Sequence, residues 1–551
     1  MSRVADRLAR VAAAQPDAIA LLEWNGRRTS YAALTARVTR IRDALARHGV
    51  RHGDRVLFAI RPSETAIASI LAINALDAVI AAAPIGAGDT LFRAQMQLLH
   101  PQWVLAESML LAAMNSRVVR RLVEWKGGLL PSLAALGDAG RIAAGPWMPG
   151  LGGASRLSVM ERAEALTATP TNHVGAVDTP DEAAEAFIVF TSGTTSAPKA
   201  VVHTRRSLTV MLDLISERLA LAPGDRLYAR DLHLVLPALF AGALAYIPSS
   251  GAYNAARTAT ELAEHRITHL FEVTANLEKL VDHLERTGGR LPPTLRCVMV
   301  GAAPVRRAFF ARLKAVLAPD AVAWCVYGMT EVLPVATISL ADKLAYPGDG
   351  DIVGAPVRGV RTAVSDTGEL VVSAPHLFAG YLGAAPVQSH HTGDLVRLDD
   401  GRIVLLGRAK DMIIRREYNI YPELHEPVIE RIPGVVRCAM VGIFDERAAD
   451  ERVVLLVEPD DLTLEAPARQ ALATRVRQAL QSGPHRIDEA AMPDDILVAA
   501  VPMSGRSHKV DKTEVRAMAR AMLASKPGAK PHAKPGAMPD AAASAPTSRV
   551  P

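Results

Sequence analysis

Short apolar runs alternate with longer amphipathic stretches through most of the first 400 residues. Residues 187–190 read "FIVF", which predicts a short buried strand. The stretch 66–83 predicts a buried helix followed by a strand. Strands that alternate with helices are typical of α/β proteins. We therefore expect an α/β fold for this part of the chain.

Two segments of this region resemble each other. Residues 48–60 read "HGVRHGDRVLFAI" and residues 219–230 read "LALAPGDRLYAR". In each, Gly-Asp-Arg forms an expected turn that leads into an apolar strand. This similarity predicts two αβ subdomains stacked within one large N-terminal domain.

The pattern changes further along the chain. Residues 365–408 predict short strands and turns, a small β-barrel-like part. After Asp411, helix, turn and strand patterns predict a small α+β domain of about a hundred residues. From about Ser525 the chain is rich in Pro, Ala, Gly and Lys without an apolar period, which predicts disorder. We expect an N-terminal domain at 1–409, a mobile C-terminal domain at 410–524 and a disordered, dispensable tail at 525–551.

Composition narrows the function classes. The 551 residues are 50% hydrophobic and 22% charged, as in ordinary soluble proteins. The net charge of +5 is small for this length, and no dense basic stripe with interleaved aromatics is present, which argues against nucleic-acid binding. Charges interrupt the apolar positions of the first 17 residues, so these do not form a signal peptide.

Two further features favour a cytoplasmic protein. The most membrane-like stretch, 66–83, contains Asn74 and Asp77 and ends before Pro84, so we expect no membrane span. The three cysteines are far apart and lack metal or redox spacing, as expected of reduced core residues: Cys297, Cys325 and Cys438.

The strand at 187–190 runs into a loop of small and hydroxylated residues, in "FIVFTSGTTSAPKAVVHTRRS". Pro198 cannot donate to a strand ladder, and Lys199 follows it. A loop of N–H and hydroxyl donors with a lysine suits an anion such as a polyphosphate. Ala197 and Ala200 disfavour a P-loop, which needs a second glycine and a hydroxyl residue after the lysine. The loop alone supports a phosphate site and a plain surface loop about equally.

Four further motifs follow in order. They are "VYGMTE" at 326–331, "HTGDLVRLDDGRIVLLGRAKDMII" at 391–414, "YNIYPELHE" at 418–426 and "HKVDK" at 508–512. Together with the loop they resemble the adenylate-forming superfamily of acyl-CoA synthetases, peptide-synthetase adenylation domains and firefly-type luciferases. The resemblance extends from residue 1 to about residue 522.

The resemblance implies that a carboxylate attacks the α-phosphate of ATP, which gives an acyl-adenylate and pyrophosphate. Preorganised donors and cations stabilise the negative charge that develops on the phosphates. The loop residues that would bind the β- and γ-phosphates are Thr191, Ser192, Gly193, Thr194, Thr195 and Lys199.

Other motif positions would bind the rest of the nucleotide. The turn along the adenine would consist of Gly301, Ala302, Ala303 and Pro304, with Tyr327 stacked on the base beside Gly328. Thr330 would contact the α-phosphate, and Glu331 would bind Mg²⁺ through a hard oxygen donor. Taken alone, the turn at 301–304 is better interpreted as a tight strand-to-helix turn, and a Tyr-Gly pair is more often part of a packed core.

The last matched positions lie near the domain boundary and the C-terminus. Asp394, with Arg408 beside it, would bind the ribose hydroxyls, although a turn aspartate after Gly393 is the simpler interpretation of Asp394 alone. Lys410 would be the hinge between the domains. Lys509 would bridge the carboxylate and the phosphate during adenylation, although a solvated lysine is common in such charged stretches.

Several positions depart from the superfamily pattern. Ala200 and Arg205 stand where relatives have "PKGV…TH", with His203 two places earlier, and Phe240 and Ala241 occupy the region of a frequent histidine. Relatives that make CoA thioesters have glycines where this chain has Arg416 and Glu417. His508 replaces the glycine before the catalytic lysine. "RSHKVDK" and "YGMTEVLPV" resemble the β-lactone synthetase branch.

We therefore expect an ATP- and Mg²⁺-dependent ligase that activates a fatty or other acyl acid and transfers it to CoA or an acyl carrier protein. A β-lactone synthetase and an enzyme that stops at acyl-AMP remain alternatives. A non-catalytic regulator that binds nucleotide or acyl groups is disfavoured, because a binding module does not need an adenylation lysine.

Overall fold

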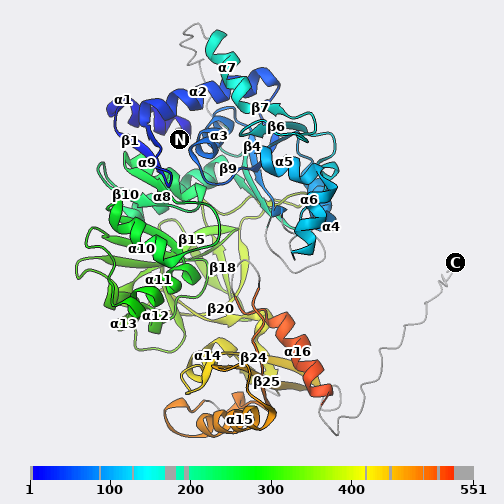
Figure 1. Ribbon diagram of the computed structural model, residues 1–551. Helices are drawn as coiled ribbons and strands as arrows, with labels where there is room; N and C mark the ends of the chain where they lie inside the picture. Colours follow the sequence, from blue (N-terminus) through cyan, green and yellow to red (C-terminus); the bar gives the residue numbers. More distant parts are fainter. Residues whose placement is uncertain are drawn as a thin grey trace, which may run out of the picture. The chain divides into compact units, whose positions relative to one another are not determined.

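The computed structural model describes residues 4–85, 89–126, 129–167, 181–190, 198–415, 418–445, 450–487, 489–504 and 509–525. The chain divides into two compact units, Met1–Leu406 and Gly407–Pro551. The N-terminal unit contains most of the helices and the two large sheets, and the C-terminal unit contains the strands and helices from β22 onward (Figure 1).

The larger sheet has thirteen strands. In spatial order they are β17 (Arg361–Val364), β18 (Glu369–Ser373), β20 (His390–Asp399), β21 (Arg402–Arg408), β16 (Asp351–Pro356), β15 (Val332–Ser339), β14 (Val322–Met329), β13 (Cys297–Gly301), β12 (His269–Val273), β10 (Arg226–Tyr228), β11 (Leu244–Ile247), β1 (Ile19–Glu23) and β2 (Arg28–Ser30). The strands from β14 to β1 in this order run parallel. Antiparallel pairs then continue the sheet through the segment where short strands and turns were expected.

The second sheet has eight strands. In spatial order they are β19 (Gly380–Tyr381), β9 (Ala200–Thr204), β8 (Glu185–Phe190), β4 (Val79–Ala82), β3 (Arg55–Ala59), β5 (Trp103–Glu107), β6 (Gly140–Ala144) and β7 (Ser155–Arg156). The strands from β8 to β7 are parallel, and β9 pairs antiparallel with β8 and β19. Parallel strands joined through helices confirm the predicted α/β class.

The helices of the N-terminal unit connect and cover these strands. They are α1 (Val4–Ala14), α2 (Tyr31–His48), α3 (Glu64–Ala75), α4 (Asp89–Leu99), α5 (Ser108–Asn115), α6 (Arg117–Trp125), α7 (Leu157–Thr167), α8 (Arg205–Leu219), α9 (Leu232–Ala241), α10 (Ala255–Glu264), α11 (Thr274–Thr287), α12 (Arg307–Val316) and α13 (Leu340–Ala345). The stretch 66–83 forms most of α3 and then β4, as predicted.

The two Gly-Asp-Arg segments form similar turns. Asp54 Oδ2 accepts a hydrogen bond of 2.8 Å from the Arg51 backbone N–H, and β3 begins at the next residue. Asp225 Oδ2 accepts one of 3.0 Å from the Ala222 N–H, and β10 begins at the next residue. Each aspartate therefore closes a turn just before a parallel strand, one in each sheet. The structure confirms that the two αβ subdomains share this local design.

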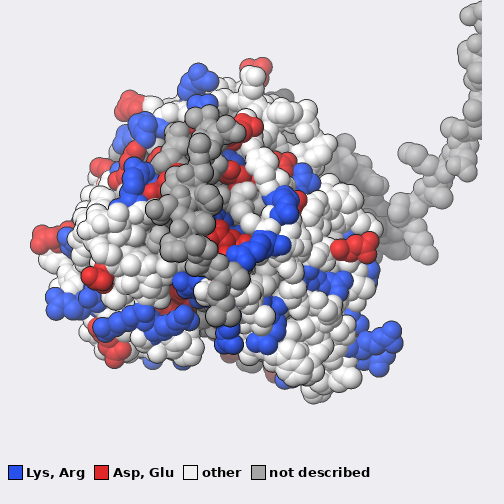
Figure 2. All heavy atoms as spheres, turned by 90° about the horizontal axis from the view of Figure 1, so that it is seen from above, with Lys and Arg blue, Asp and Glu red and all other residues white. Residues whose placement is uncertain are grey.

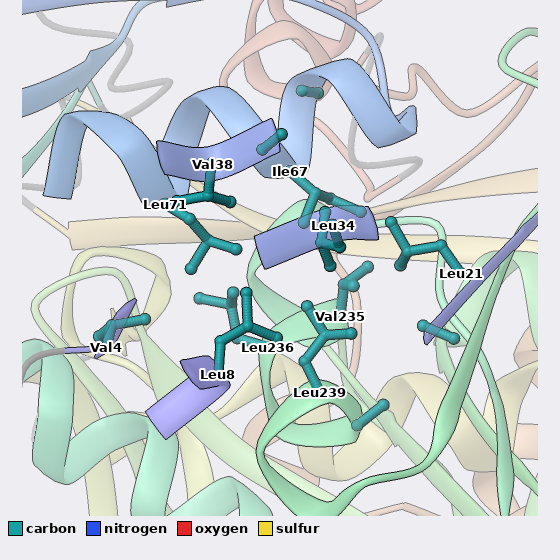
Figure 3. Packing of buried hydrophobic residues seen from close by; sticks show 14 of the residues in the cluster. Val4, Leu8, Leu21, Leu34, Val38, Ile67, Leu71, Val235, Leu236 and Leu239 are labelled. Atoms are coloured by element: carbon teal, nitrogen blue, oxygen red, sulfur yellow. The ribbon is translucent and has the colours of Figure 1, made fainter. Parts of the chain in front are cut away.

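A shared core joins the two subdomains. Side chains of α1, α2, α3 and α9 meet there, and Figure 3 shows ten labelled members: Val4, Leu8, Leu21, Leu34, Val38, Ile67, Leu71, Val235, Leu236 and Leu239. All ten are at most 6% exposed. Burial of this apolar surface is the main stabilising contribution to the N-terminal unit.

The described residues of the C-terminal unit form a hairpin, a three-stranded sheet and three α-helices, with short 3₁₀ turns between them. The hairpin pairs β22 (Ile413–Arg415) with β23 (Tyr418–Ile420), and the sheet has the order β24 (Val435–Asp445), β25 (Asp450–Pro459), β26 (Asp495–Val498). The helices are α14 (Pro422–Ile429), α15 (Ala466–Gln481) and α16 (Lys512–Ala524). Two clusters of buried residues pack on opposite faces of the sheet, since Met440 and Val441 of β24 belong to different clusters.

Other predictions concern the surface and the cysteines. Cys297, Cys325 and Cys438 are buried and free, as expected of core thiols. Among the described residues no helix has the length and apolar character needed to cross a membrane. On the face shown in Figure 2, basic and acidic side chains are interspersed, in agreement with the small net charge.

Candidate active site

The expected adenine turn follows β13 at the edge of the large sheet. Gly301 ends β13, and a Cβ at this position would lie 2.8 Å from the Val326 carbonyl oxygen, so only glycine fits. Ala302 has a φ of +68°, in the left-handed region that costs an L-residue on the order of 1 kcal/mol. The Thr274 hydroxyl holds this shape by donating to the carbonyl oxygens of Gly301 and Ala303, at 3.1 and 3.2 Å.

The neighbouring strand β14 places Tyr327 at the same sheet edge, because β13 and β14 are parallel. Its hydroxyl donates a hydrogen bond of 2.6 Å to Oδ2 of Asp394 on β20. Asp394 is 5% exposed, and its backbone N–H donates to the Thr392 hydroxyl at 3.1 Å. The residues expected at the adenine and the ribose are therefore in direct contact, although 67 positions separate them.

Thr330 and Glu331 form the two-residue turn between β14 and β15. The Glu331 carboxylate accepts a hydrogen bond of 2.8 Å from the Tyr381 hydroxyl, and its backbone carbonyl accepts one of 2.8 Å from the Phe378 N–H. Both main chain and side chain of Glu331 are thus tied to the β19 region. Burial and the carboxylate of Glu331 raise the pKa of Tyr381, so its phenol remains a donor.

Lys199 approaches the same tyrosine. Its Nζ lies 5.3 Å from the centre of the Tyr381 ring, within the range of a cation–π contact. Lys199 is exposed and directly precedes β9, whose neighbour in the sheet is β19. A cation, a phenol and a carboxylate therefore lie side by side, in the order Lys199, Tyr381 and Glu331.

His203 on β9 contacts the turn formed by Thr330 and Glu331. Its Nε2 lies 2.8 Å from the carbonyl oxygen of Thr330, and its Nδ1 lies 3.3 Å from the Ser207 hydroxyl. Because a carbonyl only accepts, Nε2 carries the proton in this contact. Burial lowers the pKa of His203, which favours the neutral ring. The imidazole therefore fixes the position of Thr330 without adding charge.

Tyr381 and His203 were not among the predicted site residues. His203 was recognised only as a displaced histidine, and "FAGYLG" at 378–383 carries no signal that distinguishes its tyrosine from a packing residue. Strand pairing brings both residues to the candidate site. Tyr381 of β19 pairs with Val201 of β9, and His203 of β9 pairs with Phe187 of β8.

The remaining predicted residues lie in the C-terminal unit or at its start. Arg408 ends β21, and Lys410 lies in a short 3₁₀ helix, Ala409–Asp411. Arg516 of α16 holds this segment by donating to the Lys410 carbonyl oxygen and to Asp411 Oδ1, at 3.3 and 3.2 Å.

Lys509 belongs to a small hairpin of the same unit. Its backbone carbonyl accepts a hydrogen bond of 2.7 Å from the Ser504 N–H, and its N–H donates to the Ser504 hydroxyl at 3.3 Å. The adjacent residues Met503 and Val510 form an antiparallel β-bridge with each other. The backbone at Lys509 is thus fixed two residues before Asp511, the N-cap of α16.

Several predicted residues lie outside the described part of the chain. They are the phosphate-loop residues Thr191, Ser192, Gly193, Thr194 and Thr195, the pair Arg416 and Glu417, His508, and the tail after Ser525. Their proposed roles stay predictions.

The candidate Mg²⁺ ligand is a single carboxylate. The described residues contain no group of three or more His, Cys, Asp or Glu side chains that could hold a metal. At nucleotides, Mg²⁺ is commonly bound by one or two carboxylates, and water and phosphate oxygens complete the octahedron. Glu331, partly exposed and oriented by Tyr381, fits that arrangement.

Comparison with known proteins gives consistent results. Residues 8–382 match the family described as AMP-binding enzyme. A feruloyl-CoA synthase from Amycolatopsis sp. is 28% identical over 460 residues, which cover 79% of this chain and 84% of the relative. An olefin beta-lactone synthetase from Stenotrophomonas maltophilia is 28% identical over 560 residues, covering 90% and 95%. An amide bond synthetase from Marinactinospora thermotolerans has the same fold, with a TM-score of 0.72, 20% identity and coverage of 94% and 99%.

Proposed function

Because this chain belongs to the AMP-binding enzyme family and is an adenylate-forming ligase, we propose that it activates an acyl acid with ATP and Mg²⁺ through the residues described above. The carboxylate oxygen of the acid attacks the α-phosphorus, the bond to the bridging oxygen breaks, and pyrophosphate leaves. The acyl-adenylate then reacts with an acceptor.

One observation carries the proposal: the hydrogen bond between Tyr327 and Asp394. It brings an aromatic ring and a carboxylate together at the carboxyl ends of parallel strands, where open α/β sheets bind ligands. We infer that the Tyr327 ring stacks on adenine and that Asp394 accepts hydrogen bonds from the ribose hydroxyls. The strained turn at Ala302 supplies the surface along the base.

The phosphates and the metal would lie at the next turn. We infer that Thr330 donates to the α-phosphate, that Lys199 pairs with the outgoing pyrophosphate, and that Glu331 holds Mg²⁺. Bound there, Mg²⁺ would neutralise charge on the phosphates. Tyr381 keeps the Glu331 carboxylate in place, and His203 keeps Thr330 in place. Lys509 of the C-terminal unit supplies the cation that acts on the attacking carboxylate and the α-phosphate.

We infer that the acid binds near the partly buried end of helix α9. Helix α9 follows β10 at this sheet edge and reads "LHLVLPALFA", with Phe240 and Ala241 at its end. Asp231 precedes the helix, is exposed, and makes no capping hydrogen bond. These residues favour an acyl acid over an amino acid, because no buried carboxylate is placed on α9 to pair with an α-amino group.

Pyrophosphate release over a panel of fatty, aryl and β-hydroxy acids tests the proposal. We expect release with at least one class of acid, abolished without Mg²⁺. Mass analysis of the products, with and without CoA, identifies the second half-reaction. Absence of acid-dependent release across the panel would contradict the proposal.

Transfer to a thiol is the favoured second step, and we infer that free CoA is a poor acceptor. Glu417 adds bulk and negative charge where CoA-using relatives have glycine, although Arg416 has the charge to pair with a CoA phosphate. Replacing both residues by glycine is expected to improve thioester formation without changing adenylation. An acyl carrier protein would then be the preferred acceptor. Efficient wild-type turnover with free CoA would contradict this inference.

Closure to a β-lactone is the second candidate, favoured by the similarity to an olefin beta-lactone synthetase over 90% of this chain. A β-hydroxyl oxygen would attack the activated carbonyl carbon, AMP would leave, and the hydroxyl proton would be released. A product lighter than its acid by one water, formed without any thiol, would distinguish this reaction from thioester formation.

A further inference from the structure

Helix α6 differs from the other helices of the N-terminal unit because none of its described residues is buried. Its apolar side chains are open to solvent: Val118 is 68% exposed, Leu122 53% and Trp125 82%. By contrast, the 12-residue helix α3 buries nine residues. The apolar side chains of α6 therefore contribute little to folding, and they form an exposed apolar surface of the kind that marks interaction sites.

These residues are ordered around the helix. Val118, Leu122 and Trp125 follow one another at spacings of four and three, so they share one face. Arg117 and Arg121 lie beside this face, about 90° away around the helix. The helix therefore presents an apolar face with a basic flank.

The helix is held in place at its N-terminal end. Ser116 caps it by accepting a hydrogen bond of 3.3 Å from the Val119 N–H. Arg120 Nη1 donates to the carbonyl oxygen of Met114, the penultimate residue of α5, at 3.0 Å. Figure 1 shows α6 at the rim of the N-terminal unit beside α5, which agrees with the contact between the two helices.

The net positive charge of the segment 117–126 indicates what kind of partner α6 binds. The segment 117–126 carries Arg117, Arg120, Arg121 and Lys126 against the acidic Glu124. In the described part of the chain, no acidic side chain forms an ion pair with Arg117 or Arg121. Basic residues that flank a face of Trp, Leu and Val suit a helix that lies in the interface of an anionic bilayer, with the apolar face inserted and the basic side chains at the headgroup level. A tryptophan at the helix end adds to this match, since its amphipathic ring prefers the headgroup level.

We propose that α6 docks the N-terminal unit on the surface of bilayers that contain anionic lipids, with Val118, Leu122 and Trp125 inserted among the headgroups. Arg117, Arg121 and Lys126 pair with lipid phosphates at the same level. The helix lies on the membrane and does not span it. This inference does not depend on the proposed acyl activation.

Co-sedimentation of the full chain with vesicles tests the proposal. Vesicles of phosphatidylcholine with a minority of phosphatidylglycerol should bind the protein, and pure phosphatidylcholine vesicles should bind it at least tenfold more weakly. High salt should release most of the bound protein, because screening removes the electrostatic attraction. Trp125→Asp should reduce the partition coefficient at least tenfold, and Arg121→Glu about fivefold or more.

Matched controls lie elsewhere on the same unit. Trp24 is 59% exposed, and Arg28 is exposed on β2. Trp24→Asp and Arg28→Glu should leave vesicle binding unchanged. All four variants should retain wild-type melting temperature and wild-type pyrophosphate release with a water-soluble acid.

Three outcomes would overturn the proposal. The first is no binding to anionic vesicles by the wild type. The second is equal loss of binding in the α6 variants and their controls. The third is a dimer in light scattering that Trp125→Asp dissociates while vesicle binding is unaffected, which would make α6 an interface with a second copy of the chain.

Discussion

The two units hold their candidate site residues in different ways. In the N-terminal unit, the side chains of the candidate residues are themselves hydrogen bonded: Tyr327 to Asp394, and Tyr381 to Glu331. In the C-terminal unit, the backbone around the functional residue is fixed, as at Lys509 and Lys410. This difference suits two tasks. A nucleotide needs a rigid, preorganised surface, whereas a lysine that acts on the reacting groups needs a fixed base and a long side chain.

The largest effect is expected for Lys509, whose replacement should separate catalysis from nucleotide binding. Lys509→Ala should slow acyl-adenylate formation by roughly 10²–10³-fold, because it removes a cation from the site of developing charge. ATP affinity should change less than threefold, since the nucleotide surface belongs to the N-terminal unit. Single-turnover assays and equilibrium ATP binding measure the two quantities.

Lys512→Ala in the same segment is not a neutral control, because Lys512 Nζ lies 3.0 Å from Glu426 Oε1. Lys314→Ala on α12 is the better one, since Lys314 has no proposed role in the site. A Lys509→Ala enzyme with near wild-type pyrophosphate release would place the catalytic cation elsewhere.

A substitution in the N-terminal unit should weaken ATP binding more than it slows acyl-adenylate formation. Asp394→Asn should raise the dissociation constant of ATP about tenfold or more, because hydrogen bonds to a charged group contribute roughly 1.5–3 kcal/mol. The rate at saturating ATP should fall much less than in Lys509→Ala. Equal losses of affinity and rate would show that Asp394 does more than bind the nucleotide.

A smaller effect is expected where the phenol orients the metal ligand. Tyr381→Phe removes the donor to the Glu331 carboxylate, which then samples more positions, and the apparent Mg²⁺ affinity should fall severalfold. Tyr346→Phe is the matched control, because the Tyr346 hydroxyl also donates to a carboxylate, that of Asp399. An equal shift in both variants would indicate a general effect on the sheet.

The smallest expected effect concerns pH and His203. Burial lowers its pKa in the folded state, so the unfolded chain binds more protons as the pH falls below about 6.5. The free energy of unfolding should therefore decrease from that pH downward, by at most about 1.4 kcal/mol per pH unit for this residue. His203→Gln should reduce the slope, while its amide preserves a donor to Thr330. If urea titrations give the same pH dependence of the free energy of unfolding for both proteins, His203 does not contribute to it.

The sequence predicted the fold class because its signals are local. A Gly-Asp-Arg turn before an apolar run needs only neighbouring residues, and both copies form as expected. The ordered motifs also selected Tyr327, Glu331 and Asp394 as candidate site residues; the structure shows the hydrogen bonds that orient these side chains, and their roles stay predictions.

Sequence patterns did not reveal the residues that contact the candidate site from distant segments of the chain. Tyr381 reaches Glu331 because β19 pairs with β9, and His203 reaches Thr330 across 127 positions. Such contacts depend on sheet order, which no local pattern encodes. The exposure of α6 depends on packing in the same way, since an apolar helix face is equally compatible with a core helix.

Acid-dependent exchange of labelled pyrophosphate into ATP tests the central claim most directly, because it requires a reversible acyl-adenylate and no acceptor. The account predicts exchange by the wild type only when a suitable carboxylic acid and Mg²⁺ are both present. Lys509→Ala should lose the exchange while still binding ATP, and Asp394→Asn should recover much of it at high ATP. Exchange that does not depend on the acid, or a Lys509→Ala enzyme that exchanges normally, would contradict the account.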